Sequence, residues 1–186
     1  MNKRDLILET TLNLSYELGI QATSIQLIMK KSAIAAGTIY HHFESKDELI
    51  DTLYSELKED MGKAVIQNLE NELSFKEKFI LIWKNLFSFY IDNPKKFEFL
   101  ENYAHSPLVR REIKAISRRH YQLAVDFFES GIQLGILRNL PINVLINIIF
   151  SNVSILTRMV ILDEIELSNE LLEETIQSSW DGIKIN

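Results

Sequence analysis

The stretch from Leu18 to Phe43 combines basic and hydrogen-bonding side chains and contains no acidic residue. The chain as a whole is acidic, with a formal net charge of −6. Because each neutralised phosphate releases counterions and attracts the protein, this stretch has the charge expected of a surface that faces nucleic acid. The alternative interpretation is a solvated face that lacks carboxylates. The cations of the stretch, with the lysine that follows it, are Lys30, Lys31, His41, His42 and Lys46.

Short capped helices are expected to position these side chains. Thr23 with Gln26 forms a T-x-x-Q pattern and Ser45 with Glu48 an S-x-x-E pattern, and both are typical of capping boxes at helix starts. Gly19 follows the first helix, where a left-handed cap residue is common. The spacing predicts helices over about 3–18, 24–32 and 35–42, as in a helix-turn-helix. The side chains expected to face inward are Leu27, Ile28, Ile34, Ile39 and Phe43.

Composition favours an all-α protein and excludes several kinds of site. The 186 residues are 46% hydrophobic and include only six glycines and three prolines. The absence of cysteine excludes a disulfide framework, a thiolate nucleophile and a cysteine-based metal site. There is no H-E-x-x-H motif and no glycine-rich phosphate loop, and the adjacent His41 and His42 do not share a helix face. We therefore expect no enzyme activity, metal or cofactor.

The remaining sequence predicts further helices. The helix that starts at Ser45 is expected to run towards Leu69, and an aromatic stripe at helical spacing precedes the break at Asn93-Pro94. Pro141 is well placed at the start of an apolar helix to about Leu162. That segment is long enough to suggest a membrane span, but polar residues interrupt it, so a buried or interfacial helix and no membrane are expected. No secretory signal is visible, and a cytoplasmic protein is expected.

One motif resembles a known family. Gly37-Thr38-Ile39-Tyr40-His41-His42-Phe43, followed by Ser45-Lys46-Asp47-Glu48-Leu49, is similar to the DNA-reading half of TetR-family transcriptional regulators. The resemblance implies an all-α fold with an N-terminal three-helix helix-turn-helix head. A linking helix would join this head to a helical ligand-binding and dimerisation domain. The implied DNA-binding domain is 1–46 and the regulatory and dimerisation domain 47–186, of which 47–70 is the linking helix.

The resemblance also assigns DNA contacts. In the family the third helix enters the major groove and the residues around it bind phosphates. Thr38 matches a threonine that contacts bases or backbone, and Lys46 matches a phosphate-binding lysine at the start of the fourth helix. Gln26 stands where many members place an arginine, and glutamine can bind adenine bidentately. The candidate DNA-binding residues are Ser24, Gln26, Lys31, Thr38, Tyr40, His41, His42 and Lys46.

Three of these candidates have alternative roles. Gln26 is also the last residue of the expected capping box, so capping and DNA contact compete. Tyr40 is expected to pack against the first helix as well. For His42 the alternative is a buried histidine with its hydrogen bonds satisfied.

The sequence departs from the family pattern at the start of the third helix. Ala35 and Ala36 stand where members usually have a small polar residue and a Lys, Gln or Pro, and alanine offers only contacts with thymine methyl groups. Specificity would then depend on the other candidates and on DNA shape. Ala33 replaces the usual glycine, which predicts a slightly different turn. These departures support an alternative function, a helical interaction module of the same fold with weak or lost sequence-specific DNA binding.

For the remainder of the chain the resemblance implies a homodimer and a ligand pocket. The dimer would form through about 141–162 and 168–180, and symmetry would suit two successive major grooves of operator DNA. Aromatic residues with a few polar groups suggest a pocket for a small, largely apolar effector, although filling of a core is the alternative for any one of them. The candidates are Trp83, Phe87, Tyr90, Tyr103, His105, Tyr121, Phe128 and Asn152. The expected function is a ligand-responsive repressor.

Overall fold

The computed structural model describes residues 2–70, 72–104, 106, 112, 113, 115 and 119–185, and they form helices that confirm the all-α prediction. The chain divides into two compact units. The first comprises Met1–Glu59 with Asn93–Arg119, and the second comprises Asp60–Asp92 with His120–Asn186. His105, a predicted ligand residue, lies outside the described residues.

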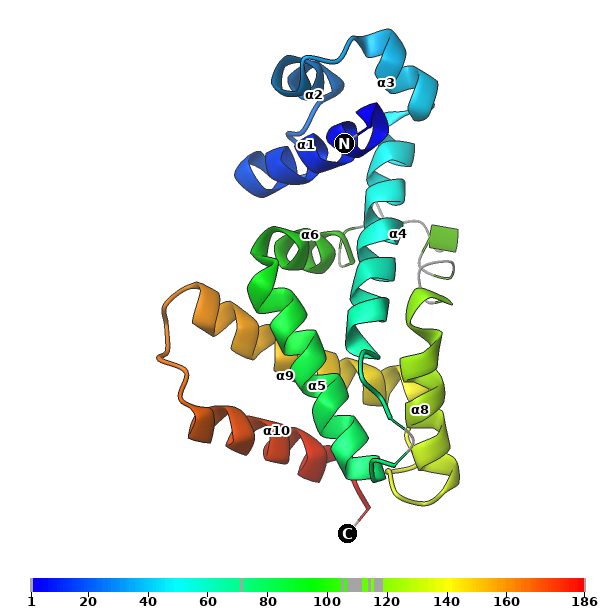
Figure 1. The fold of residues 1–186 in the computed structure, drawn as a ribbon, viewed down its shortest axis with the longest axis vertical. Helices are drawn as coiled ribbons and strands as arrows, with labels where there is room; N and C mark the ends of the chain where they lie inside the picture. The colour runs from blue at the N-terminus through cyan, green and yellow to red at the C-terminus, as the bar shows by residue number, and fades with distance from the viewer. Residues whose placement is uncertain are drawn as a thin grey trace. The chain divides into compact units, whose positions relative to one another are not determined.

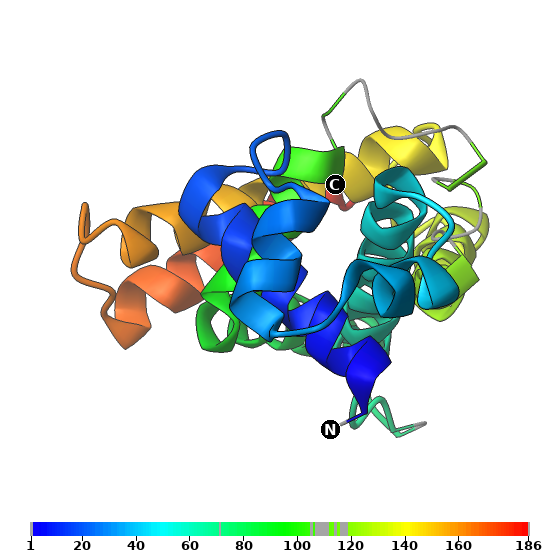
Figure 2. The ribbon, with the colours of Figure 1, turned by 90° about the horizontal axis from the view of Figure 1, so that it is seen from above.

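Three helices at the N-terminus form the predicted helix-turn-helix. They are α1 (Lys3–Leu18), α2 (Ile25–Ser32) and α3 (Ala36–His42), and α2 packs against both of the others (Figure 1, Figure 2). The predicted apolar core is confirmed for four of its five members, because Ile28, Ile34, Ile39 and Phe43 are buried and Leu27 is half-buried. The short helices are therefore held together by one apolar residue or two each, which leaves their other faces free.

The capping pattern at the start of α2 differs from the prediction by one residue. Ser24 is the N-cap, and its Oγ accepts a hydrogen bond from the Leu27 amide at 3.3 Å. Thr23 is fully buried, and its hydroxyl donates to the Gly19 carbonyl at 2.9 Å. The T-x-x-Q capping box was therefore wrong, because the threonine closes the preceding turn instead. Gly19 does have a positive φ of 85°, but its ψ of 154° lies outside the left-handed helical region.

Ala33 ends α2 in the left-handed conformation, with φ 56° and ψ 27°. A Cβ in this region clashes with the backbone, at a cost of roughly 1–2 kcal/mol that glycine does not incur. Ala33 is exposed, so no packing is lost on its removal. We expect Ala33→Gly to raise the free energy of unfolding by about 0.5–1 kcal/mol, since the flexibility gained by the unfolded chain offsets part of the relief. Urea unfolding measures the change, and an unchanged or lower stability would show that Ala33 is not strained.

In the first unit, the part of α4 (Lys46–Val65) up to Glu59 and the helix α6 (Pro94–Ala104) are tied to each other and to α1. The buried Asp51 accepts a hydrogen bond from the Tyr103 hydroxyl at 2.8 Å, which joins α4 to α6. Lys95 donates to the Asn13 side chain at 2.6 Å, which joins α6 to α1. Burial lowers the pKa of Lys58 on α4 to about 8, and the charge of Glu101 on α6 partly opposes this shift. The helix α6, some fifty residues further along the chain than the head, is therefore hydrogen-bonded to both α1 and α4.

The prediction that the fourth helix runs towards Leu69 was too long. The helix ends at Val65, and Asn68 adopts a positive φ of 60° in the turn that follows. Asparagine tolerates this conformation better than most residues. Ser74 and Glu77 form an S-x-x-E capping box, with reciprocal hydrogen bonds of 2.7 and 3.3 Å that start the next helix.

The second unit is built around α5 (Phe75–Asp92) and α9 (Ile142–Ile161), which pack against each other (Figure 1). The 3₁₀ helix η1 (Arg119–Tyr121), α8 (Gln122–Gln133) and α10 (Asn169–Ile183) complete it. Pro141 precedes α9 as predicted, and Ser168 precedes α10, where its Oγ accepts a hydrogen bond from the Leu171 amide at 3.1 Å. The core is aromatic, with Phe79, Trp83, Phe87, Tyr90 and Phe128 all buried.

The helix α9 is long and apolar enough to cross a membrane by length and composition, but such a helix also occurs in cores of soluble proteins. One of its faces is buried through Leu145, Ile149 and Val153. Its opposite face exposes large apolar side chains, including Ile155 at 60%. The helix is therefore covered on one side in the single chain and exposes apolar side chains on the other.

Candidate nucleic-acid interface

The helix α3 presents almost its whole length to solvent. Ile39 is fully buried, and Phe43 immediately after the helix is also buried. These two side chains anchor the helix, because they are one turn apart on the same face. Between and beside them Tyr40, His41 and His42 are exposed and Thr38 is half-buried. The arrangement leaves hydroxyl and imidazole groups on the outer face, where they can donate to phosphates or base edges.

The histidine pair is available for contact. His42 is exposed, so the alternative of a buried histidine was wrong. Its ring lies against that of His41 at a centroid distance of 5.4 Å, in an edge-to-face arrangement. Tyr40 is 52% exposed, which leaves its hydroxyl end accessible. Three adjacent side chains therefore extend from the last turn of α3.

The N-terminus of α2 carries two more candidates. Because Ser24 is the cap, Gln26 has no capping role, and it is exposed. Gln26 therefore does not have to choose between capping the helix and contacting DNA, and its side-chain amide can contact DNA. The Ser24 oxygen accepts from the helix, so its hydroxyl hydrogen remains able to donate to a phosphate.

The lysines differ in their surroundings. Lys31 at the end of α2 is exposed, and its ammonium group lies 4.0 Å from the carboxylate of Glu17, a distance typical of a weak surface pair. Lys46 instead donates a hydrogen bond to the backbone carbonyl of Gln21 at 3.0 Å. Two candidate phosphate ligands thus sit in different environments.

The alanines at the start of α3 are partly accessible. Ala35 is the N-cap and is exposed, but its side chain makes no capping hydrogen bond. Ala36 is half-buried. Both can meet a thymine methyl group, and neither can bond to a base.

Two further exposed positions on α2 and α3 were not among the candidate DNA-binding residues, although Lys30 is one of the cations of the acid-free stretch. Lys30 is exposed on α2 and is a second cation there. Gly37 is exposed on α3, and a Cβ at this position would meet no atom within 4 Å. The fold therefore does not require this glycine, and its small size allows the backbone to approach a ligand closely. Its place inside the Gly-Thr-Ile-Tyr motif was the signal that could have nominated it.

The predicted ligand residues do not form one group. Trp83, Phe87, Tyr90 and Phe128 are buried in the second unit, where Trp83 and Phe87 stack at a centroid distance of 5.6 Å. Tyr103 belongs to the first unit and is bonded to Asp51.

The other two described candidates lie at the edge of the second unit. Tyr121 is half-buried in η1, next to the ring of Phe150. Asn152 is exposed on α9 and donates to Ser179, whose hydroxyl also accepts from the Trp83 indole, each at 3.2 Å. The buried aromatic cluster is therefore linked to the surface of α9 through a serine that the sequence did not nominate.

Family models match both parts of the chain. The model described as bacterial regulatory proteins, tetR family, matches residues 7–53, and the model described as tetracyclin repressor-like, C-terminal domain, matches residues 74–184. The chain belongs to the TetR family. Its members are transcriptional regulators that bind DNA, and not enzymes.

Individual relatives agree with this assignment. An HTH-type transcriptional regulator of Haemophilus influenzae is 25% identical, over 89% of this chain and 87% of that protein. The crystal structure of a TetR-family regulator from Shewanella has a TM-score of 0.92 at 23% identity, with both chains covered completely. FadR from Bacillus subtilis, solved in complex with stearoyl-CoA, has a TM-score of 0.72 at 21% identity, over 94% of this chain and 98% of that one. The fold is shared along its whole length.

Proposed function

We propose that this TetR-family regulator is a ligand-responsive repressor that binds operator DNA as a homodimer. The observation that carries the proposal is the exposed outer face of α3, held from behind by Ile39 and Phe43. DNA binding is assigned to residues 1–46, and regulation and pairing to 47–186, with 47–70 as the linking segment. On this proposal the contacts come from Ser24, Gln26, Lys31, Thr38, Tyr40, His41, His42 and Lys46.

The exposed face of α9 supports the homodimer. Its outward residues follow one another at alternating steps of four and three, the spacing of a coiled-coil seam, and four of the six are large and apolar. A seam of this kind needs a partner helix that crosses at a small angle. A second copy supplies one, because a two-fold axis brings the same face of α9 together with itself. The seam consists of Val144, Ile148, Ser151, Ile155, Arg158 and Leu162.

A groove beside this seam extends the proposed interface to α10. It has a volume of about 410 Å³ and is lined by Ile155, Met159, Leu171 and Thr175, among others. The homodimer through about 141–162 and 168–180 would fill this groove with a side chain of the partner copy. Covering both the seam and the groove would remove the large apolar side chains of α9 from water.

The buried aromatic cluster supports a largely apolar effector. Trp83, Phe87 and Phe128 form a buried apolar cluster, and the Trp83 indole donates to the Ser179 hydroxyl beside it, so an effector would bind by entering among these packed rings. The fold shared with FadR, whose crystal structure contains stearoyl-CoA, supports an acyl chain as the class of effector to test first. To release DNA, the effector must bind one state of the dimer more tightly than the other, and ordinary coupling amounts to about 1–3 kcal/mol.

The test is a binding measurement on duplexes selected from a random pool by the purified protein. We expect fluorescence anisotropy to show binding that resists non-specific competitor, with two protomers per site and weaker binding when stearoyl-CoA is added. Thr38→Ala should change the selected sequence, because the hydroxyl faces the groove in this proposal. Gln133→Ala, at an exposed polar position on α8, is the control, and it should leave the selected sequence and the DNA affinity unchanged.

Weak and fully competed binding would contradict the repressor. That result would favour the helical interaction module, for which the exposed and non-polar Ala35 is the supporting observation. Unchanged DNA affinity with stearoyl-CoA would exclude acyl-CoA as the effector while leaving DNA binding intact.

A further inference from the structure

Arg4, in the first turn of α1, connects this helix to two other elements of the first unit. Its guanidinium group donates a hydrogen bond of 2.5 Å to the carboxylate of Glu56 on α4. The same group lies over the ring of Phe43, which directly follows α3, at 5.7 Å from the ring centroid. This distance is within the range of a cation–π contact. One side chain therefore links the starts of α1 and α4 to the end of α3 (Figure 1).

The backbone of Arg4 is itself held in place. Asn2 caps α1, and its side chain accepts a hydrogen bond from the Asp5 amide at 2.9 Å. The guanidinium group is planar and bonds in a fixed fork, so it holds a partner in one geometry better than a lysine would. The side chains of Arg4 and Glu56 are 38% and 43% exposed. The ion pair thus starts from a fixed backbone and is partly shielded from solvent.

Phe43 is the residue that holds the end of α3. Its ring is 2% exposed, and its amide donates to the Ile39 carbonyl at 2.9 Å, which closes the helix. The ring of Phe43 lies 6.3 Å from that of His42, which in turn lies 5.4 Å from that of His41. A chain of contacts therefore leads from Arg4 through Phe43 to the two exposed histidines of the proposed DNA-binding face.

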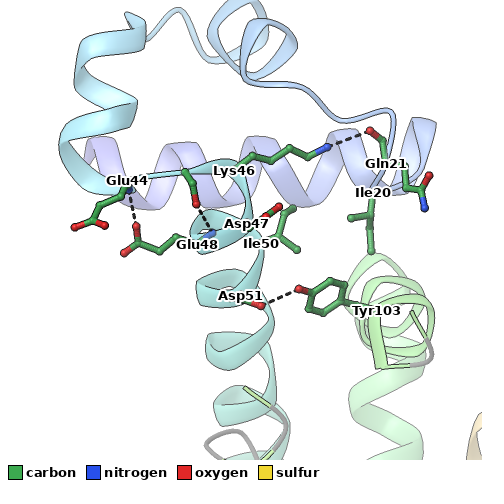
Figure 3. A pocket seen from close by; sticks show the side chains of 10 residues that line it. Ile20, Gln21, Glu44, Lys46, Asp47, Glu48, Ile50, Asp51 and Tyr103 are labelled. Carbon is green, nitrogen blue, oxygen red and sulfur yellow. Dashed lines mark hydrogen bonds between the residues drawn. The ribbon is translucent and has the colours of Figure 1, made fainter. Parts of the chain in front are cut away.

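The connection from α3 to α4 comprises only residues 43–45. The Glu48 amide donates to Ser45 Oγ at 3.1 Å, and the carboxylate of Glu48 accepts from the Glu44 amide (Figure 3). This capping box fixes the start of α4, but its hydrogen bonds do not reach α3. The orientation of α3 on α4 therefore depends on contacts that span both helices, and Arg4 makes such a contact through Phe43 and Glu56.

We propose that Arg4 is a positioning residue for DNA binding, which holds Phe43 and the end of α3 at a fixed place on α4 by pairing with Glu56. The proposal rests on the DNA-binding face proposed above. Partly exposed ion pairs contribute little to global stability, so loss of this pair should leave the fold intact. It should weaken binding of the correct sequence, which requires His41 and His42 in place, and should spare the general attraction of DNA by charge.

The first test needs no DNA. Arg4→Met and Glu56→Met each remove one partner and keep an aliphatic stem. We expect amide hydrogen exchange at residues 38–43 to become at least fivefold faster in both variants and to stay unchanged in α5. Glu9→Met, at an exposed carboxylate of α1, is the control and should exchange like the wild type. Unchanged exchange at 38–43 in either Arg4→Met or Glu56→Met would overturn the proposal, whatever the protein does with DNA.

The second test uses Glu56, because positioning and electrostatics predict opposite signs for its removal. Loss of a carboxylate makes the protein less acidic, which by itself favours binding of any duplex. If Glu56 acts through Arg4, Glu56→Met should instead bind a selected duplex at least tenfold more weakly, while an unrelated duplex is bound at least as well as before. Glu9→Met removes the same charge and should weaken neither. Unchanged or tighter binding of the selected duplex by Glu56→Met would overturn the proposal.

Exchange of the two charges distinguishes the ion pair from a direct contact of Arg4 with DNA. Arg4→Glu and Glu56→Arg each place like charges together, and each should weaken binding of the selected duplex at least tenfold. The double variant restores the pair and should recover most of the affinity. If Arg4 instead bound a phosphate, Arg4→Met would weaken both duplexes and reduce the slope of log K against log salt by about 0.9. The double variant would then stay weak, and the proposal would be overturned.

The outcomes separate the two proposals. A wild-type protein with no preference for any duplex would overturn the proposed function, and the exchange measurement would still decide whether Arg4 holds the end of α3. Faster exchange at 38–43 with unchanged affinity for the selected duplex would overturn the part of Arg4 in DNA binding and leave the proposed function standing.

Discussion

Replacement of Ile155 by glutamate is expected to convert the proposed dimer into monomers and to abolish tight binding of operator DNA. Ile155 lies near the middle of the seam on α9 and is 60% exposed in the single chain. In a two-fold dimer each copy would bury this side chain against the other. The substitution therefore acts twice in one interface.

The size of the effect follows from two terms. Loss of a buried isoleucine removes about 1.5–3 kcal/mol of apolar burial per side chain. Burial of a carboxylate without a partner costs several kcal/mol more, and two glutamates close to the axis also repel each other. Even about 4 kcal/mol in total would raise the dissociation constant of the dimer by roughly a factor of 10³. The affinity for DNA should fall as the dimer dissociates, since a monomer has one head and binds a single half-site.

Sedimentation equilibrium and anisotropy on a selected duplex measure the two losses. Leu123→Glu is the matched control, because Leu123 is 63% exposed but lies on α8, away from the seam. It should leave both the dimer and the DNA affinity intact. If Ile155→Glu remained dimeric, the pairing surface would have to be sought on another part of the chain.

The seam illustrates why the sequence predicted the helix and a part in pairing for it, but not which of its faces would be exposed. The run from Ile142 to Ile161 is apolar on both its buried and its exposed sides, so periodicity alone cannot separate the two. The face became visible only once α5, α8 and α10 had covered the opposite side. The sequence did predict the helix itself, because Pro141 is a local signal for a helix start that needs no tertiary information.

Local signals also explain the successes and the error in the head. The buried positions Ile28, Ile39 and Phe43 follow from helical spacing, and the structure confirms them. The cap of α2 was misplaced because Thr23 and Ser24 are adjacent and both are good caps. The choice between them depends on the turn at Gly19, which takes the threonine hydroxyl.

Contacts between distant residues could not be predicted from local patterns. The hydrogen bond from Lys46 to Gln21 joins two elements whose approach depends on the folded head, and no local pattern predicts it. Tyr103 was grouped with the aromatic residues of the second unit, although it is bonded to Asp51 in the first. Helical spacing places residues on a face, but it does not say which neighbour that face meets.

A second large effect is expected at Gly62, a buried residue of α4 that packs against η1. A Cβ added at this position would lie 2.0 Å from the carbonyl oxygen of His120 and 2.7 Å from its carbonyl carbon. Both atoms are backbone, so no side-chain rotation can relieve the clash, and α4 and η1 must move apart. Such close approach is the reason for glycine here, since its φ is not in the region that alanine avoids.

We therefore expect Gly62→Ala to lower the free energy of unfolding by about 2–3 kcal/mol or more. Overpacking typically costs about 1–3 kcal/mol, and a rigid backbone contact belongs at the upper end of that range. Alanine has a helix propensity about 1 kcal/mol better than glycine, so the clash must exceed this gain for stability to fall.

Gly182→Ala in α10 isolates the propensity term. A Cβ there would meet no atom within 4 Å, so this variant should be about 0.5–1 kcal/mol more stable than the wild type. Urea unfolding of both variants under one set of conditions gives two changes of opposite sign. If Gly62→Ala were stabilised as much as Gly182→Ala, α4 would not approach η1 in solution, because the propensity gain would then be unopposed.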